Sequence, residues 1–137
     1  MKPSRKEDFR LVTGHGRFTA DWHFPNEAHA VVVRSDRGHA RIVSADWSAV
    51  REAPGVLAVI TAEDVAAEGF GMIPGGAMIT GSGGQTIKMN QMPVLATDRV
   101  RFVGQPVALV VAQTLQQARD AAEQAYIDYE DLPASAS

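Results

Sequence analysis

The side chains in this sequence that could carry out chemistry are few, and the histidines are the first to consider. His15, His23, His29 and His39 all lie in the first third of the chain. Their spacing matches neither His-Glu-x-x-His nor His-x-His, which would place two imidazoles on one metal ion. His29 and His39 could face each other across a hairpin, but two ligands without a third carboxylate make an incomplete metal site. We therefore expect structural or surface histidines and assign no metal ligand.

Serine, carboxylate and cysteine side chains offer no better catalytic site. Ser44, Ser48 and Ser82 lack the context of a nucleophile elbow. Thr61 and Asp64 have the spacing of a capping box, so the acidic residues there are expected to complement a helix N-terminus rather than to transfer protons. The chain has no cysteine, which excludes disulfides, thiolate-bound zinc, iron–sulfur ligation and a cysteine nucleophile within it. We expect no catalytic and no cofactor-binding residue in this chain.

Two glycine-rich strings invite a phosphate-binding interpretation. Gly81-Ser82-Gly83-Gly84-Gln85 lacks the Gly-Lys-Ser/Thr ending of a phosphate loop, and no strong strand leads into it. Gly14-His15-Gly16 is not surrounded by a βαβ unit. Both strings are weak signals for a phosphate site.

The most specific local feature is Gly104-Gln105-Pro106, where a glycine and a proline flank a side-chain amide just before an apolar run. One interpretation is a bend that lets the chain enter a sheet. The other is an exposed amide and backbone that contact a neighbouring subunit or the edge of a cofactor pocket. We therefore name Gly104, Gln105 and Pro106 as candidate interface residues.

Length, composition and charge limit the class of protein. A chain of 137 residues with 45% hydrophobic and 21% charged residues fits one soluble domain. A net charge of −3 provides no basic field, so nucleic acid is a poor partner. No run approaches the ~20 apolar residues of a membrane span, and the charged first residues lack the apolar core of an export signal. We expect a cytoplasmic protein without its own membrane anchor.

The hydrophobic pattern predicts a strand, a helix and a second strand after the bend. Residues 106–112 are too apolar to alternate, which is typical of a central strand buried on both faces. Thr114 is a suitable N-cap for a helix with a narrow face of small residues. Residues 127–132 alternate between apolar and polar side chains, which predicts a half-exposed strand.

Earlier in the chain, residues 28–34 and 39–46 resemble the two strands of a β-hairpin joined by turn-forming residues. Asp46 is expected to cap a short helix that ends at Pro54-Gly55. Residues 56–60 form a further buried strand in this interpretation, and Thr61 opens a second short helix.

The chain is expected to form a single domain over residues 1–137, with two segments of different character. Residues 1–16 are predicted to form an arm, and residues 68–93 form a glycine-rich variable insert. The insert carries too many apolar side chains to be simply solvated, so we expect a partner to cover it. The candidate interface residues there are Met72, Ile73, Met78, Ile79 and Met89. Composition and spacing by themselves support a soluble α+β domain with a partner loop.

Several strings together resemble one family. The segment from Glu7 to Phe18 is similar to the opening of the molybdenum-binding large subunit of the xanthine dehydrogenase, aldehyde oxidase and aerobic carbon monoxide dehydrogenase family. Further strings match in the same order, in His29–Ser35, His39–Ile42, Pro54–Asp64, Pro93–Ala96, Val103–Ala108 and Asp128–Pro133. Phe102 stands where the family commonly has tyrosine, and Ala28 where leucine is usual, and both changes affect packing rather than chemistry.

The resemblance implies the N-terminal α/β-hammerhead domain of that subunit, an α+β fold for which we expect a mixed sheet with a β-hairpin, a buried central strand and a packed helix. It also implies a non-catalytic structural role in a molybdopterin-dependent hydroxylase or dehydrogenase. No cofactor is expected in this chain, whereas molybdopterin, iron–sulfur clusters and FAD are implied for the full assembly. The implied partners are the molybdopterin-binding remainder of the large subunit and the iron–sulfur and FAD subunits. The alternative is an independent small binding module that keeps the fold without the enzyme.

Overall fold

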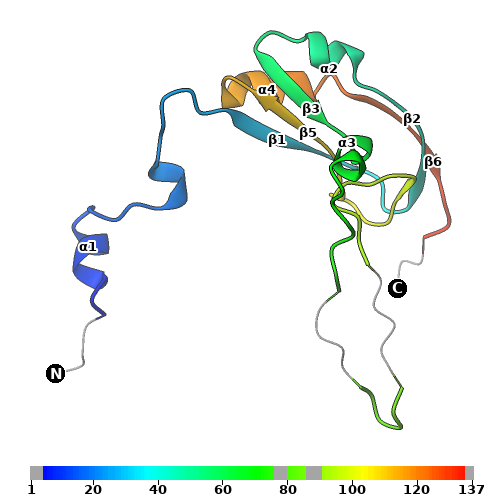
Figure 1. Ribbon diagram of the computed structural model, residues 1–137, viewed down its shortest axis with the longest axis horizontal. Helices are drawn as coiled ribbons and strands as arrows, with labels where there is room; N and C mark the ends of the chain where they lie inside the picture. The colour runs from blue at the N-terminus through cyan, green and yellow to red at the C-terminus, as the bar shows by residue number, and fades with distance from the viewer. Residues whose placement is uncertain (1–4, 76–79, 86–90, 135–137) are drawn as a thin grey trace.

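The apolar run after Pro106 forms the middle strand of a sheet in the computed structural model, which describes residues 5–75, 80–85 and 91–134. This strand, β5 (Pro106–Ala112), lies between β1 (His29–Arg34) and β3 (Val56–Ile60) and is antiparallel to both. Figure 1 shows the three strands side by side at the centre of the molecule. The expected central strand is confirmed.

The two faces of β5 contribute to two separate hydrophobic clusters. Val110 packs with Val50, Val59 and Ala121, whereas Val107 packs with a second group made of Ala40, Ala96 and Val100. Trp47 is partly buried against both clusters. Because successive side chains of a strand point to opposite faces, a strand covered on both sides is apolar throughout, as this one is.

The helix that follows, α4 (Leu115–Ala122), covers the first sheet through alanines. The hydroxyl of Thr114 accepts a hydrogen bond from the Gln117 backbone N–H over 3.2 Å, which confirms the predicted N-cap. Ala118 and Ala121 are fully buried and let the helix lie close to the strands.

The remaining strands form a second antiparallel sheet in which β2 (Ala40–Asp46) lies between β4 (Arg99–Val100) and β6 (Tyr126–Asp131). The expected hairpin is therefore wrong, because β1 and β2 belong to different sheets, and the expected mixed sheet is two antiparallel sheets. The residues between β1 and β2 carry the chain from one sheet to the other, so each strand pairs with a partner that is distant in sequence. The α+β hammerhead class itself is confirmed.

Two short helices, α2 (Ser48–Glu52) and α3 (Ala62–Ala67), flank β3 in the chain. The Asp46 carboxylate accepts hydrogen bonds from the Ser48 N–H at 2.9 Å and the Ser48 hydroxyl at 2.6 Å, so it serves the first turn of α2. The strand between the helices is less buried than expected, since Leu57 is 57% exposed. The reason is that β3 is an edge strand of its sheet.

Residues 5–26 form an N-terminal extension that leaves the two sheets and stands apart from them in Figure 1. It contains α1 (Asp8–Val12) and a 3-10 turn, η1 (Thr19–Asp21), and neither contains a buried residue. No helix in the described part of the chain is both long and apolar enough to cross a membrane. The division into one domain with an arm at 1–16 and an insert at 68–93 stays a prediction.

Candidate functional site

The predicted interface residues Gly104, Gln105 and Pro106 lie in a corner that is bonded to the end of β1. Gly104 has a φ of +87°, which a residue with a Cβ rarely adopts. Its N–H donates to the Ser35 carbonyl at 2.7 Å, and the Arg34 guanidinium donates to the Gly104 carbonyl at 2.8 Å. The Ser35 N–H in turn donates to the Gln105 carbonyl at 3.0 Å. The corner is held by two backbone–backbone hydrogen bonds and by one hydrogen bond from the Arg34 side chain.

The side chain of Gln105 points into the domain rather than toward a partner. It is 2% exposed, and its Oε1 accepts a hydrogen bond from the Arg101 backbone N–H over 2.7 Å. The Gln105 N–H also donates to the Phe102 carbonyl at 3.2 Å. Of the two interpretations of this string, the one that required an exposed amide is therefore wrong, because the side chain closes its own loop and satisfies a backbone donor there. An interface role for the backbone of Gly104 to Pro106 stays a prediction.

What the corner exposes is an apolar pair that the sequence argument did not select. Phe102 is 41% exposed and Val103 is 67% exposed, and both lie between the residues joined by the Gln105 amide. A loop closed by internal hydrogen bonds presents such side chains in one conformation, which lowers the entropic cost of docking. The signal available in the sequence was the adjacent pair of apolar residues at a turn.

The base of the glycine-rich insert is the second predicted interface region. Ile73 and Met92 pair as an isolated antiparallel bridge, with the Ile73 N–H donating to the Met92 carbonyl at 2.7 Å. Ile73 and Met72 are both about half exposed, and Phe70 and Val94 nearby in the chain are also exposed. Met78, Ile79 and Met89 lie outside the described residues. The Ala96 N–H donates to the Pro106 carbonyl at 2.8 Å, so the returning branch of the insert is tied to the corner.

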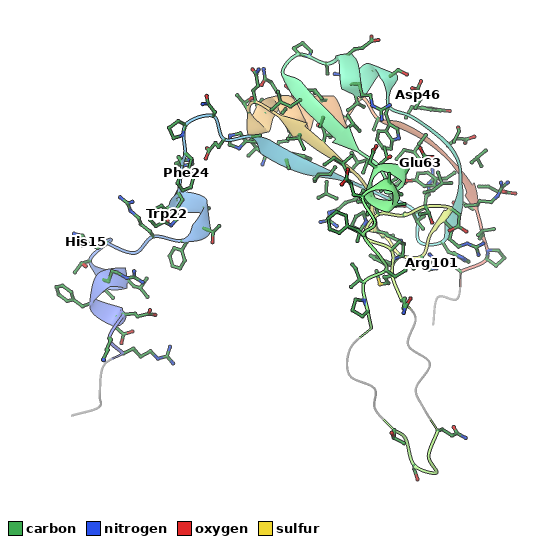
Figure 2. All side chains as sticks on the ribbon, in the orientation of Figure 1. His15, Trp22, Phe24, Asp46, Glu63 and Arg101 are labelled. Atoms are coloured by element: carbon green, nitrogen blue, oxygen red, sulfur yellow. The ribbon has the colours of Figure 1, made fainter. Side chains whose placement is uncertain are left out.

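An open groove of about 590 Å³ lies between β2 and α3, and no motif in the sequence predicted it. Trp47, Arg51 and Glu63 line it, together with the Asp64 end of α3, and Figure 2 labels Glu63 at this place. The Asp64 carboxylate accepts hydrogen bonds from the Thr61 N–H and hydroxyl at 2.7 and 2.8 Å, which confirms the capping interpretation. These bonds, the backbone one first, lower the pKa of Asp64, so this carboxylate is committed to the helix.

The histidines do not assemble into a site. His39 Nδ1 lies 2.7 Å from the Pro133 carbonyl, and His29 Nε2 lies 3.7 Å from Glu27, so the two do not face each other. The described residues contain no group of three histidine, cysteine, aspartate or glutamate side chains that could hold a metal ion. With no cysteine in the sequence, this chain does not by itself fit an iron–sulfur cluster.

Comparison with known proteins decides the family. The model of the family described as the aldehyde oxidase and xanthine dehydrogenase a/b hammerhead domain matches residues 13–133. The chain belongs to this family. Its hammerhead domain is 41% identical to the gamma subunit of the 6-hydroxypseudooxynicotine dehydrogenase complex of Paenarthrobacter nicotinovorans, over 94% of this chain and 16% of that protein. It is 37% identical to the carbon monoxide dehydrogenase large chain of Afipia carboxidovorans, over 96% of this chain and 15% of the relative.

Solved structures show the same hammerhead fold. Quinoline 2-oxidoreductase from Pseudomonas putida 86 superimposes with a TM-score of 0.82 at 41% identity, over 95% of this chain and 16% of that one. Carbon monoxide dehydrogenase from Oligotropha carboxidovorans does so with a TM-score of 0.81 at 37% identity, over 96% of this chain and 15% of that one. The chain thus spans about a sixth of the length of these relatives.

Proposed function

We propose that this hammerhead domain is a structural and assembly part of a molybdenum hydroxylase and supplies no catalytic residue. The observation that carries the proposal is that the family match takes in nearly all of the chain, whereas the relatives continue for several times its length. The carboxylates of Asp46 and Asp64 are used in helix caps, and the amide of Gln105 is used in a turn. The chemistry is therefore assigned to the portion of the relatives that this chain does not match.

The proposed partner is the molybdopterin-binding remainder of the large subunit, followed by the iron–sulfur and FAD subunits. Molybdopterin, iron–sulfur clusters and FAD are cofactors of that assembly in this proposal, and none is held by this chain alone. One relative is named a large molybdopterin subunit and others are named as subunits or chains of larger enzymes, which supports the assignment. A cytoplasmic location belongs to the same proposal.

The surface proposed for these contacts is the corner around Phe102 and Val103 together with the base of the insert. Aromatic and methionine side chains are enriched at the centres of interfaces, and the exposed Phe102, Met72 and Met92 on this surface are of these types. The independent binding module is less well supported, because the relatives described above carry the hammerhead sequence inside much longer chains.

The experiment is purification of the complex that contains this domain from its native source, with measurement of molybdenum by mass spectrometry. We expect stoichiometric molybdenum and co-purifying subunits. Replacing both Phe102 and Val103 by serine should raise the dissociation constant of the complex at least tenfold, which corresponds to about 1.4 kcal/mol. Leu57→Ser is the control, because it removes an apolar side chain whose exposure lies between those of Phe102 and Val103 from β3, an edge strand of the first sheet. A purified complex without molybdenum would refute the proposal.

A further inference from the structure

The N-terminal extension exposes several aromatic side chains that do not pack against the two sheets of the domain. Its four aromatic side chains are at least half exposed, and Leu11 and Val12 are exposed as well. These aromatic residues are Phe9, Phe18, Trp22 and Phe24. Because an aromatic side chain can bury about 150–250 Å², together they offer roughly 500 Å² of the ~800 Å² that each side of a stable interface contributes.

Trp22 and Phe24 form an ordered face on this extension. Their rings are stacked at 6.4 Å with an interplanar angle of 9°, and the Arg17 guanidinium lies 5.2 Å from the centre of the Trp22 ring. The residue between them, His23, points elsewhere and contacts Glu27 at 3.0 Å. Successive residues of an extended chain project to opposite sides, so Trp22 and Phe24, which are two residues apart, share one side. Figure 2 shows both on the part of the extension that leads toward β1.

The extension is also tied to the domain at one end and braced inside itself. The Glu27 carboxylate accepts a hydrogen bond from the Phe24 N–H at 3.1 Å and lies 3.7 Å from His29 in β1. Asp21 accepts a hydrogen bond from the Phe18 N–H at 2.8 Å. These local contacts set the course of the chain, but they cover none of the aromatic rings.

The charges of the extension point to an apolar protein surface as the occupant. Four cationic residues in the extension stand against three anionic ones, and Glu27 follows directly, so the net field is too small to steer the extension to nucleic acid or to an anionic lipid surface. The cations are Arg5, Lys6, Arg10 and Arg17, and the anions within the extension are Glu7, Asp8 and Asp21. Recognition is therefore assigned to the stacked rings and their neighbours.

The length of the relatives indicates where that surface lies. The superposition on carbon monoxide dehydrogenase covers 96% of this chain, which leaves fewer unaligned residues than the extension contains. Most of the extension therefore has a counterpart in the carbon monoxide dehydrogenase chain. The aligned part makes up only 15% of that chain. An extended segment that exposes its aromatic side chains in this domain has the rest of such a chain available to pack against.

We propose that residues 5–26 are a strap that docks, through Trp22 and Phe24, onto an apolar surface of the molybdopterin-binding remainder of the same large-subunit polypeptide. This inference rests on the proposed function, since it needs that remainder to be present. The strap adds a second contact, separate from the one at Phe102 and Val103, because the strap joins the start of β1 whereas the corner is bonded to the end of β1.

Limited proteolysis of the complete enzyme tests the strap. Trypsin cleavage after Arg10 and Arg17 should be slow in the assembled protein. Replacing both Trp22 and Phe24 by serine should accelerate this cleavage at least tenfold. Leu57→Ser, which lies outside the strap, should leave the rate unchanged. Rapid cleavage of the unaltered enzyme at these two sites would overturn the proposal.

Photo-crosslinking identifies the occupant. A benzoylphenylalanine placed at position 22 should crosslink to the same polypeptide, and enzyme assembled from mixed isotope-labelled and unlabelled large subunits should give crosslinked peptides of one isotope only. Mixed-isotope peptides would assign the surface to a second copy, and crosslinks to another subunit would assign it there, and either outcome would overturn the proposal. An enzyme that contains molybdenum but has a freely cleaved extension refutes the strap alone, whereas a complex without molybdenum refutes the proposed function.

Discussion

The buried side chain of Gln105, which is 2% exposed, accepts a hydrogen bond at its Oε1 from the Arg101 backbone N–H over 2.7 Å. The bond closes a loop of a few residues whose tip is Phe102 and Val103. The most recognisable polar residue of the chain thus acts on its own backbone, and the side chains it displays are apolar.

Gln105→Leu keeps much of the side-chain volume but leaves the Arg101 N–H without its acceptor. Since an unsatisfied backbone donor costs ~1–3 kcal/mol, we expect the free energy of unfolding to fall by about 2 kcal/mol. Urea unfolding followed by circular dichroism measures it. Gln113→Leu, at an exposed position, is the control. Equal unfolding midpoints for the two variants would contradict the assigned role.

Gly55→Ala tests the turn that leads into β3. Gly55 has a φ of +79°, and a Cβ there would lie 2.3 Å from the Gln117 side chain in α4. A left-handed conformation costs a residue with a Cβ about 1–2 kcal/mol, so the free energy of unfolding should fall by at least that amount. Adding Gln117→Ala should recover only the part due to the clash. Gly38→Ala, where a Cβ meets nothing within 4 Å, should have a small effect in the same unfolding assay.

The alanine face of α4 should not tolerate a larger side chain. Ala121 is 1% exposed and packs with Val50, Val59 and Val110. Ala121→Leu should therefore lower the free energy of unfolding by ~1–3 kcal/mol through overpacking. Thermal unfolding is a suitable readout. The same change at Ala67, which is exposed in α3, is the control and should be nearly neutral. An equally neutral Ala121→Leu would contradict the prediction and would show that α4 is free to move outward.

The cap of α3 should make part of the stability depend on pH. The hydrogen bonds from Thr61 lower the pKa of Asp64 below its ordinary value of 3.8. A group whose pKa is lower in the folded state stabilises it fully above the unfolded value and loses that contribution as the pH falls through the folded value. Wild type should therefore be more stable than Asp64→Asn at neutral pH, and the difference should shrink below about pH 4.

Urea unfolding midpoints of the two proteins across this pH range provide the measurement. Glu63→Gln removes a carboxylate from the same turn without touching the contacts of Thr61, so it should show no such convergence with wild type. A difference between wild type and Asp64→Asn that stays constant down to the lowest pH would show that the carboxylate does not act as a cap.

The features that the sequence predicted are those decided by near neighbours or by a strongly apolar run. The caps at Thr61 and Thr114 are contacts between residues three apart, and they follow from residue type and spacing. The central position of β5 follows from its apolar character, because only a strand covered on both faces can bury such a run. The ordered strings of residues were sufficient for the family, which the comparison confirmed.

Only the tertiary structure decided which strands pair and where the polar groups of the corner point. Alternation of side chains shows that one face of a strand is buried, but it does not identify the strand beside it, so β1 and β2 look like a hairpin while each pairs with strands that come much later in the chain. Arg34 and Gly104 are 70 residues apart, and their hydrogen bond exists because β1 and β5 meet. Gln105 likewise points inward because its Oε1 accepts a hydrogen bond from the Arg101 N–H, and this N–H lacks a backbone acceptor only once the loop has formed in the folded chain.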